Sequence, residues 1–258
     1  MPELPDLQVF SSNLKKRFKG KKLLKIEIRN KKRIKTPATK FKKAVERAKL
    51  QDVYREGKEL RFQFSNGNII GLHLMLHGTL KIFEGRNDAK YTIAELLFDN
   101  GKGLAITDFQ GMANLSLNPA EKEAPDAMSP AVNKSYMSEK FNSKANIKKV
   151  LMDQHVIRGI GNAYADEILW RAGVSPLSVA KKIPADKITK IGKSIKSVLK
   201  NAEKQIIKSN PDLISGEVRD FLDIHNSKKQ KSPTGGKIRN MMLGGRKTYF
   251  TDEQAEYK

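Results

Sequence analysis

The two residues that follow the initiator methionine, Pro2 and Glu3, are of types that could perform covalent catalysis together. An initiator Met before a small residue is normally removed, and we expect its loss to turn the Pro2 ring nitrogen into a free secondary amine. An α-amino group ionises close to physiological pH, so a useful fraction of it is neutral and nucleophilic, whereas a lysine amine needs much more help. Such an amine can form a Schiff base, and the neighbouring Glu3 carboxylate is placed to carry the proton.

The sequence that follows predicts a short helix that would hold this amine in one place. Leu7, Phe10, Leu14 and Phe18 recur at steps of three, four and four residues, which is the apolar stripe of an amphipathic helix. A Pro-Asp pair just before this stripe suits the first turn, because proline lacks a donor and an acid is favoured near the positive end of a helix.

The composition predicts a polyanionic partner. The chain has 258 residues, with 50 Lys and Arg against 28 Asp and Glu, and its formal net charge is +22. Basic groups placed on phosphates release condensed counterions, which favours binding to nucleic acid. An anionic membrane surface is the rival partner, but no long apolar run and no lipidation signal supports it. We expect no targeting segment, and therefore a protein that is not secreted.

Neither a metal nor a cofactor is expected. The absence of cysteine excludes disulfides and thiolate zinc sites. His73 and His77 are four residues apart, but they lie in the strand-like stretch "GLHLMLHGTL", where that spacing does not bring two imidazoles onto one metal.

Residues 22–118 are predicted to be rich in β-strands. The runs "LRFQFSNGNIIGLHL" and "AELLFDNGKGLAITDF" alternate around Asn66-Gly67 and Asn100-Gly101, and Asn-Gly between alternating runs is a strong hairpin signal. Several short strands with such turns indicate a sandwich or a barrel.

The remainder of the chain is predicted to be helical up to a final hairpin. After the aperiodic stretch "NPAEKEAPDAMSPAVNKS", the segments "SKANIKKVLMDQ" and "NAYADEILWRAG" predict two helices, and Pro184 begins a longer one. The final stretch is rich in Gly, Lys and Arg, and predicts a hairpin with a polar tail.

A glycine-bounded loop, "RGIGNAYADE", places backbone amides and Asn162 at the start of a helix. Helix amino termini and such turns accept phosphate readily. The alternative is a plain connection between two helices, but the basic charge of the chain favours a phosphate site.

The motifs stand together in an order that resembles one known family. Pro2 and Glu3, Lys58 in "EGKEL", "GIGNAYADEILWRAGVSP" and "GGRKTYF" make the whole chain similar to the formamidopyrimidine-DNA glycosylase/endonuclease VIII family. The resemblance implies an α+β fold, in which a β-sandwich with flanking helices precedes a helix–two-turns–helix domain.

Because "TYFTDEQAEYK" stands where cysteines of a zinc finger would fall, the chain resembles the zincless-finger members, whose β-hairpin keeps the finger's shape without metal. The implied regions are a catalytic sandwich (1–118), a linker (119–135), a DNA-binding domain (136–225) and a hairpin with its tail (226–258).

The resemblance also implies an activity. It predicts a bifunctional DNA glycosylase and AP lyase of base excision repair, which excises oxidised bases through a Pro2 Schiff base and cleaves the strand by β,δ-elimination. Lys58 would bind backbone phosphate and assist β-elimination, and Arg246 would clamp the phosphate beside the lesion and assist δ-elimination. The alternative is that Lys58 and Arg246 have no specific role and are simply two of the 50 basic residues. The partner would be double-stranded damaged DNA, and the enzyme a monomer that is cytoplasmic and nucleoid-associated in a bacterium, or nuclear in a eukaryote.

Five residues are expected to contact DNA by this resemblance: Leu76, Tyr91, Gln110, Gly161 and Asn162. Leu76, in "HLMLHG", stands where the family commonly has a methionine that wedges into the duplex.

Two departures from the family pattern affect the expected site. Asp6 replaces a more usual glutamate, which shortens the reach of that side chain by one methylene. "TDFQGMANL" stands where many members have "DPRRFG", so that Gly111 and Met112, within one residue, take the places of the arginine and phenylalanine of the wedge.

Two other classes of function stay open. One is a damaged-DNA-binding protein of the same fold without catalysis, against which Pro2, Glu3 and Lys58 argue. The other is an RNA- or ribosome-associated module, since helix–two-turns–helix elements occur in such proteins.

Overall fold

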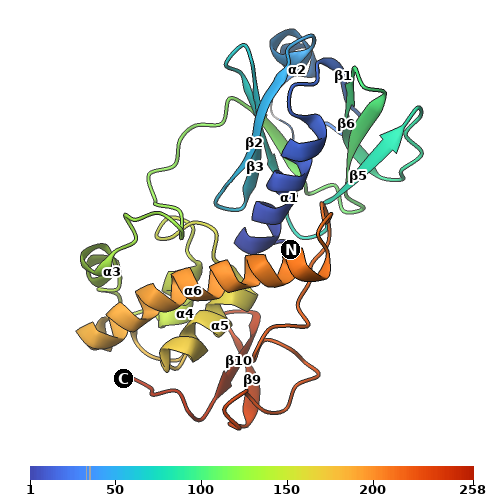
Figure 1. Cartoon of the computed structure of the whole chain (residues 1–258). Coiled ribbons are helices and arrows are strands. Elements are labelled where there is room, and N and C mark those ends of the chain that lie inside the picture. Colours follow the sequence, from blue (N-terminus) through green and yellow to red (C-terminus); the bar gives the residue numbers. More distant parts are fainter. Residues whose placement is uncertain (33, 35) are drawn as a thin grey trace. The chain divides into compact units, whose positions relative to one another are not determined.

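The computed structural model describes residues 1–32, 34 and 36–258, which divide into two compact units (Figure 1). The sheet unit contains Met1–Glu121 and Ile206–Glu217, and the helical unit contains Lys122–Gln205 and Val218–Lys258. Within the described residues, no helix combines the length and the apolar character that crossing a membrane requires.

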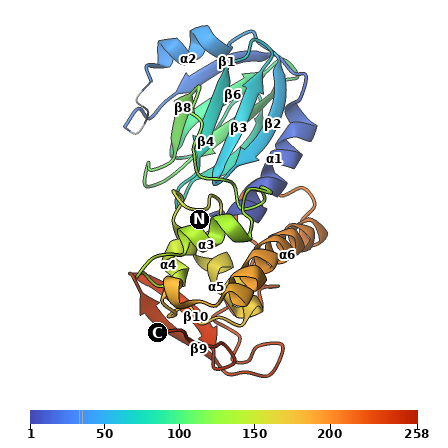
Figure 2. The ribbon, with the colours of Figure 1, turned by 90° about the vertical axis from the view of Figure 1, so that its left-hand side faces the viewer.

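The sheet unit contains two four-stranded antiparallel sheets. The first has the order β1 (Leu23–Ile28), β6 (Thr92–Phe98), β7 (Lys102–Thr107) and β5 (Thr79–Glu84). The second, whose strands lie side by side in Figure 2, has the order β2 (Leu50–Glu56), β3 (Glu59–Phe64), β4 (Ile69–His73) and β8 (Asn114–Leu117). The predicted strand-rich sandwich is confirmed, in an α+β fold.

Both predicted Asn-Gly hairpins are present. Asn66 and Gly67 connect β3 to β4, and Asn100 and Gly101 connect β6 to β7. The two glycines have φ angles of 83° and 76°, in the left-handed region that a residue with a side chain rarely adopts. The turn residues therefore specify which strands pair.

Helix α1 (Leu4–Phe18) covers the core of the sheet unit with its predicted stripe. Leu7, Phe10, Leu14 and Phe18 are all buried, and the ring of Phe18 lies 4.5 Å from that of Phe98 on β6. The short helix α2 (Ala38–Val45) was not predicted, because only Phe41 and Val45 mark its apolar side.

The carboxyl-terminal part of the sheet unit is fastened to α1. The buried side-chain amide of Asn13 donates to the carbonyl oxygens of Pro211 and Leu213, at 2.9 Å each. A segment far along the sequence therefore completes this unit, and nothing in the hydrophobic pattern predicts it.

The helical unit is built around a long amphipathic helix. Its helices are α3 (Lys134–Lys140), α4 (Ile147–Met152), α5 (Asn162–Ala172), the short 3₁₀ helix η1 (Ala180–Lys182) and α6 (Ala185–Ser209), and the last turn of α6 belongs to the sheet unit. The predicted long helix is present, and one of its faces is buried: Ile188, Ile191, Ile195, Leu199 and Ala202.

The predicted carboxyl-terminal hairpin is formed by β9 (Ile238–Leu243) and β10 (Arg246–Thr251). The residues after it are anchored, although the sequence predicted a polar tail. The buried side chain of Gln254 donates to the Val174 carbonyl at 2.7 Å, and the Ala255 carbonyl accepts from the Ser175 amide at 2.8 Å.

Candidate active site and DNA-binding residues

The amino-terminal turn of α1 fixes Pro2 and Glu3. Glu3 is the N-cap residue, and it forms a capping box with Asp6, in which each side chain accepts a hydrogen bond from the other's backbone amide. The Glu3 amide lies 2.8 Å from Asp6 Oδ2, and both residues are buried. The shorter side chain of Asp6 therefore reaches its partner, and the departure from a glutamate leaves this contact intact.

A cavity of about 690 Å³ opens beside Pro2 in the sheet unit. Its lining brings together three residues that the sequence predicted, Pro2, Leu76 and Tyr91. It also contains Phe109 and Glu217, which the sequence analysis did not single out. Three other site candidates of this unit, Glu3, Lys58 and Gln110, are not among its lining residues.

Leu76 projects from a tight loop between β4 and β5. The loop is closed by the Gly78 amide, which donates to the Leu74 carbonyl at 2.9 Å, and by the Met75 amide, which donates to His73 Nδ1 at 3.1 Å. Leu74 is buried, whereas Leu76 is 57% exposed. The loop thus turns one leucine into the core and presents the other to solvent at the mouth of the cavity.

The loop that follows β7 is organised by the buried carboxylate of Asp108. Its oxygens accept hydrogen bonds from the amides of Gln110, Met112 and Ala113, at 2.8–2.9 Å. The arrangement leaves Gln110 exposed and buries the neighbouring Gly111.

Phe109 is the most prominent side chain of this loop. It is 60% exposed, and its ring lies 4.6 Å from the ring of His77. Phe109 and Gln110, rather than Gly111 and Met112, are therefore the exposed residues of the segment for which the resemblance implies a wedge.

Lys58 lies at the tip of the hairpin between β2 and β3, where it is half-buried. The guanidinium of Arg55 donates to Gln8 Oε1 on α1 and to the Gly57 carbonyl, both at 3.1 Å. These bonds tie the tip of the hairpin to the helix that begins beside Pro2.

Arg246 lies in the helical unit, where it is exposed at the start of β10. It lines a cavity of about 400 Å³ together with Asn146, Lys148 and Lys149. Asp153 also lines this cavity, and Lys148 is buried against the carboxylate of Asp166. The exposed cations at the cavity are therefore Arg246 and Lys149, whose positive charge can attract anions.

Asn162 connects this region to helix α5. It is the first residue of α5, after the N-cap residue Gly161, and its side-chain amide donates to the Lys247 carbonyl at 2.9 Å. Among the described residues, none donates to the buried Asn162 Oδ1. The start of α5 and the start of β10 are therefore held side by side.

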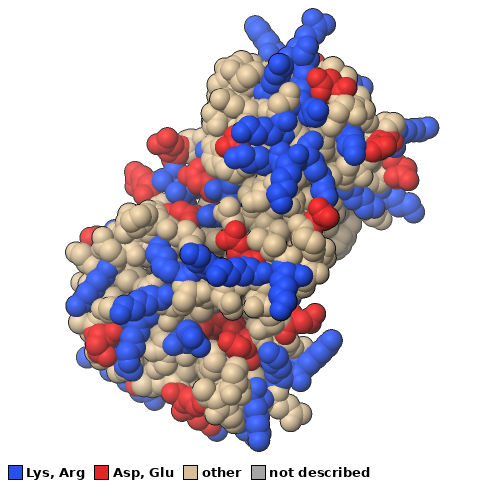
Figure 3. Space-filling model, viewed as in Figure 1, with Lys and Arg blue, Asp and Glu red and all other residues tan. Residues whose placement is uncertain are grey.

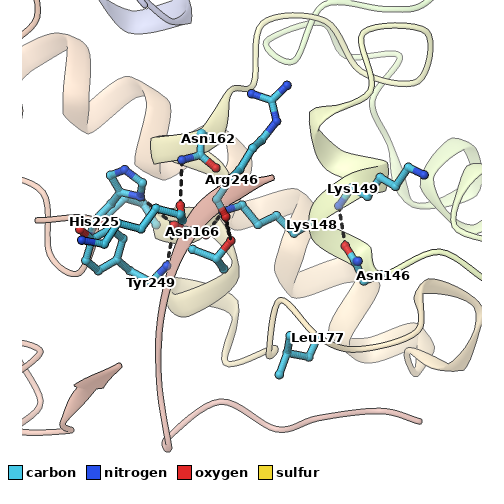
Figure 4. A network of polar contacts seen from close by, with 12 residues as sticks. Asn146, Lys148, Lys149, Asn162, Asp166, Leu177, His225, Arg246 and Tyr249 are labelled. Atoms are coloured by element: carbon cyan, nitrogen blue, oxygen red, sulfur yellow. Dashed lines mark hydrogen bonds and ion pairs between the residues drawn. The ribbon is translucent and has the colours of Figure 1, made fainter. Parts of the chain in front are cut away.

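The buried carboxylate of Asp166 joins four parts of the helical unit (Figure 4). Its Oδ1 lies 2.8 Å from Lys148 Nζ on α4, which also donates to Thr248 Oγ1 on β10 at 2.7 Å. Its Oδ2 accepts from the Tyr249 amide at 2.9 Å and lies 2.7 Å from His225 Nδ1. In the sequence, Asp166 stands out only as part of the motif "GIGNAYADEILWRAGVSP". An acid on the inner side of a helix was the signal for such a site, because buried charges require partners.

The next residue, Glu167, organises the segment that contains His225. Its carboxylate accepts hydrogen bonds from the amides of Asp223, Ile224 and His225, at 2.7–2.9 Å. Burial raises the pKa of Glu167, although these three amides act in the opposite direction.

Basic side chains cover much of the visible surface, including the outer side of α6 (Figure 3). On the helical unit's part of α6, the exposed lysines are Lys190, Lys193, Lys200 and Lys204. The excess of positive charge is thus displayed on the surface, where phosphates could reach it.

Across the part of the chain that the structure describes, no group of three or more His, Asp or Glu side chains is arranged to hold a metal ion. His73 and His77 have other partners, the Met75 amide and the Phe109 ring.

Two family models match the chain. The formamidopyrimidine-DNA glycosylase N-terminal domain matches residues 1–115, and the formamidopyrimidine-DNA glycosylase H2TH domain matches residues 124–210. The formamidopyrimidine-DNA glycosylase of Mycoplasma mobile is 30% identical over 267 residues, and that of Pelotomaculum thermopropionicum 27% identical over 268 residues, each match covering 97% of both chains.

Solved structures have the same fold. The Lactococcus lactis Fpg in a complex with abasic-site DNA has a TM-score of 0.89 and 23% identity, and MutM in a complex with DNA containing carbocyclic 8-oxo-G has a TM-score of 0.88 and 24% identity. Both matches cover 99% of this chain and 100% of the other.

Proposed function

Since the chain belongs to the formamidopyrimidine-DNA glycosylase family and is therefore a DNA glycosylase of base excision repair, we propose that it also cleaves the DNA strand, with Pro2 as its nucleophile. The single observation that carries this proposal is the cavity beside Pro2. Its volume of about 690 Å³ lies within the range of small-molecule sites, and therefore suits a nucleotide turned out of the duplex.

The proposed reaction begins when the neutral Pro2 nitrogen attacks C1′ of the damaged nucleotide. A bond forms between this nitrogen and C1′, and the bond from C1′ to the base breaks, so that the base leaves with the bonding electrons and takes up a proton. The attached nitrogen next releases its own proton, and its lone pair forms a double bond to C1′ while the bond from C1′ to O4′ breaks. The product is an open sugar with a charged iminium, and O4′ takes up a proton delivered through the Glu3 carboxyl group. Glu3 supports this step, because its buried carboxylate is held directly beside Pro2 by the capping box.

The iminium then acts as an electron sink for strand cleavage. Loss of a proton from C2′ expels the 3′ phosphate in β-elimination, and loss of a second proton expels the 5′ phosphate in δ-elimination. We assign phosphate contacts to Lys58 at the hairpin tip and to Arg246 beside Lys149, because cationic side chains on rigid turns can neutralise the leaving phosphates. The neighbouring Asn162 is assigned a further contact with the DNA backbone.

When a nucleotide is turned out of the duplex, it leaves a gap in the base stack that a side chain can fill. Leu76 is our candidate, because the loop presents it to solvent as an apolar side chain beside the cavity. We assign Tyr91 and Gln110 to supporting DNA contacts, since both are exposed on loops of the same unit.

Borohydride trapping tests the proposal. The processed protein should form a covalent complex with an abasic-site duplex, and a variant with one residue added before Pro2 should form none, because its Pro2 nitrogen is an amide. Glu3→Gln should lose base excision far more than DNA binding. Undiminished trapping by the extended variant would exclude Pro2 as the nucleophile, and absence of trapping by the processed protein would favour a binding protein without catalysis.

Chelation tests the expectation that no metal takes part. Strand cleavage should survive treatment with a chelator, and elemental analysis should find no stoichiometric zinc. A loss of cleavage that added zinc restores would contradict this expectation.

A further inference from the structure

The amino group at the start of the chain has a specific partner. The Met1 ammonium donates to the carboxylate of Glu217, which comes from the last residues of the segment Ile206–Glu217. Glu217 and Pro2 line the same cavity. The side chains of Met1 and Glu217 are 26% and 34% exposed, so that this ion pair is partly shielded from solvent.

We infer that Glu217 is the counter-ion of the Pro2 amine once Met1 has been removed, and of the iminium that forms on that amine. The inference rests on the proposed role of Pro2 as the nucleophile. Successive backbone nitrogens lie at most about 3.6 Å apart, so the Pro2 nitrogen is within one residue's reach of the position at which the Met1 nitrogen now meets Glu217. At roughly 4–6 Å an opposite charge still favours the charged form of a group.

The other charged and titratable groups around the cavity have different tasks. Glu3 and Asp6 form the capping box of α1, and Asp108 holds the loop after β7 through three amides. His77 contacts the ring of Phe109, and Tyr91 is exposed at the cavity's edge. Glu217 is the cavity carboxylate whose described contact is with the amino-terminal ammonium itself.

Two consequences follow from this placement. Before attack, the carboxylate stabilises the ammonium form of Pro2, so that a higher pH is needed to release the nucleophile. After attack, it stabilises the positively charged adduct, and the covalent intermediate accumulates. Glu217 thereby sets the pH range of the enzyme without itself forming or breaking a bond.

The test is the pH profile of single-turnover cleavage of an abasic-site duplex by the full chain, with removal of Met1 verified by mass spectrometry. Glu217→Gln should move the rising limb of the profile to lower pH by roughly one unit, because an opposite charge has been removed. Glu217→Asp should return it towards the wild-type position. Glu84→Gln, which removes a carboxylate that is 73% exposed on the same unit, controls for the change in net charge and should leave the profile unmoved.

The outcomes separate this inference from the proposed function. Superimposable profiles for the wild type, Glu217→Gln and Glu217→Asp, with normal borohydride trapping, would overturn the role of Glu217 and leave Pro2 as the nucleophile. Equal shifts for Glu217→Gln and Glu84→Gln would also overturn it, because net charge would then be the cause. Absence of trapping by the wild type at every pH would instead refute the proposed function.

Discussion

Lys148 Nζ lies 2.8 Å from Asp166 Oδ1, and both side chains are almost completely buried in the helical unit. The pair joins α4 to α5, and the further bonds of its two members to Thr248 and Tyr249 extend this connection to β10. Because β10 begins with Arg246, the pair supports the strand that carries a candidate phosphate contact.

Breaking this pair should destabilise the protein strongly. Lys148→Met removes the cation beside Asp166 Oδ1, while the contacts of Oδ2 with His225 and the Tyr249 amide stay. For the loss of one partner of a buried pair we expect a decrease of about 3–5 kcal/mol in the free energy of unfolding. Lys149→Met, at the exposed neighbouring position, should change it by less than about 0.5 kcal/mol. Urea denaturation of the two variants measures both changes in the free energy of unfolding. Similar decreases in the two variants would show that the buried pair does not stabilise the protein more than an exposed lysine does.

Arg246 should contact phosphate rather than a base. Arg246→Ala should weaken binding to all duplex sequences about equally, and lower the slope of log K against log salt concentration by roughly one unit. Arg239→Ala is a matched control, since Arg239 is exposed on the same hairpin but paired with Asp252 at 2.7 Å. A loss confined to one type of lesion would indicate base recognition instead.

The base opposite the lesion should be read weakly. Leu76 can fill a gap in the stack but has no hydrogen-bonding group, and the exposed amide of Gln110 can both donate and accept. We therefore expect excision rates opposite C, A, G and T to lie within about tenfold, or about 1.4 kcal/mol. Single-turnover excision of one lesion opposite each base is the measurement, and a hundredfold preference for C would show that another residue reads that base.

Glu167 should make stability depend on pH in a defined direction. Because burial raises its pKa, the native state holds a proton between pH 4.5 and the raised value, where the unfolded chain has released it. The free energy of unfolding therefore falls as the pH rises through this window. Urea titrations across this range should show that Glu167→Gln removes the fall, whereas Glu139→Gln, at a side chain that is 71% exposed, retains it. If the free energy of unfolding of Glu167→Gln still falls as the pH rises, other titrating groups cause the fall.

The sequence pattern predicted the helices and hairpins that are determined by residues close together in the sequence. The stripe of α1 and the two Asn-Gly hairpins followed from residues that are neighbours in sequence, and the structure confirms them. A short helix such as α2 was missed, because two buried residues, Phe41 and Val45, do not establish a period.

The parts of the site that depend on distant contacts could not be predicted in this way. Glu217 reaches the cavity only because Asn13 fastens residues after α6 to α1. Asp166 has partners on three other segments, which no spacing in the sequence reveals. The resemblance to a family supplied Pro2 and Arg246, but assigned nothing to either of these acids.

The division of the sheet unit between two stretches of sequence has a consequence for its synthesis. When the ribosome has made Glu121, all the strands of the two sheets exist, yet the piece that closes the unit does not. That piece ends at Glu217, and at about 5–20 residues per second it follows on the order of ten seconds later. During this interval the nascent chain contains every strand of the two sheets but lacks the segment that carries Glu217 to the cavity beside the amino terminus. We therefore expect methionine removal to precede completion of the cavity around Pro2, because Gly216 and Glu217 of its lining are synthesised last.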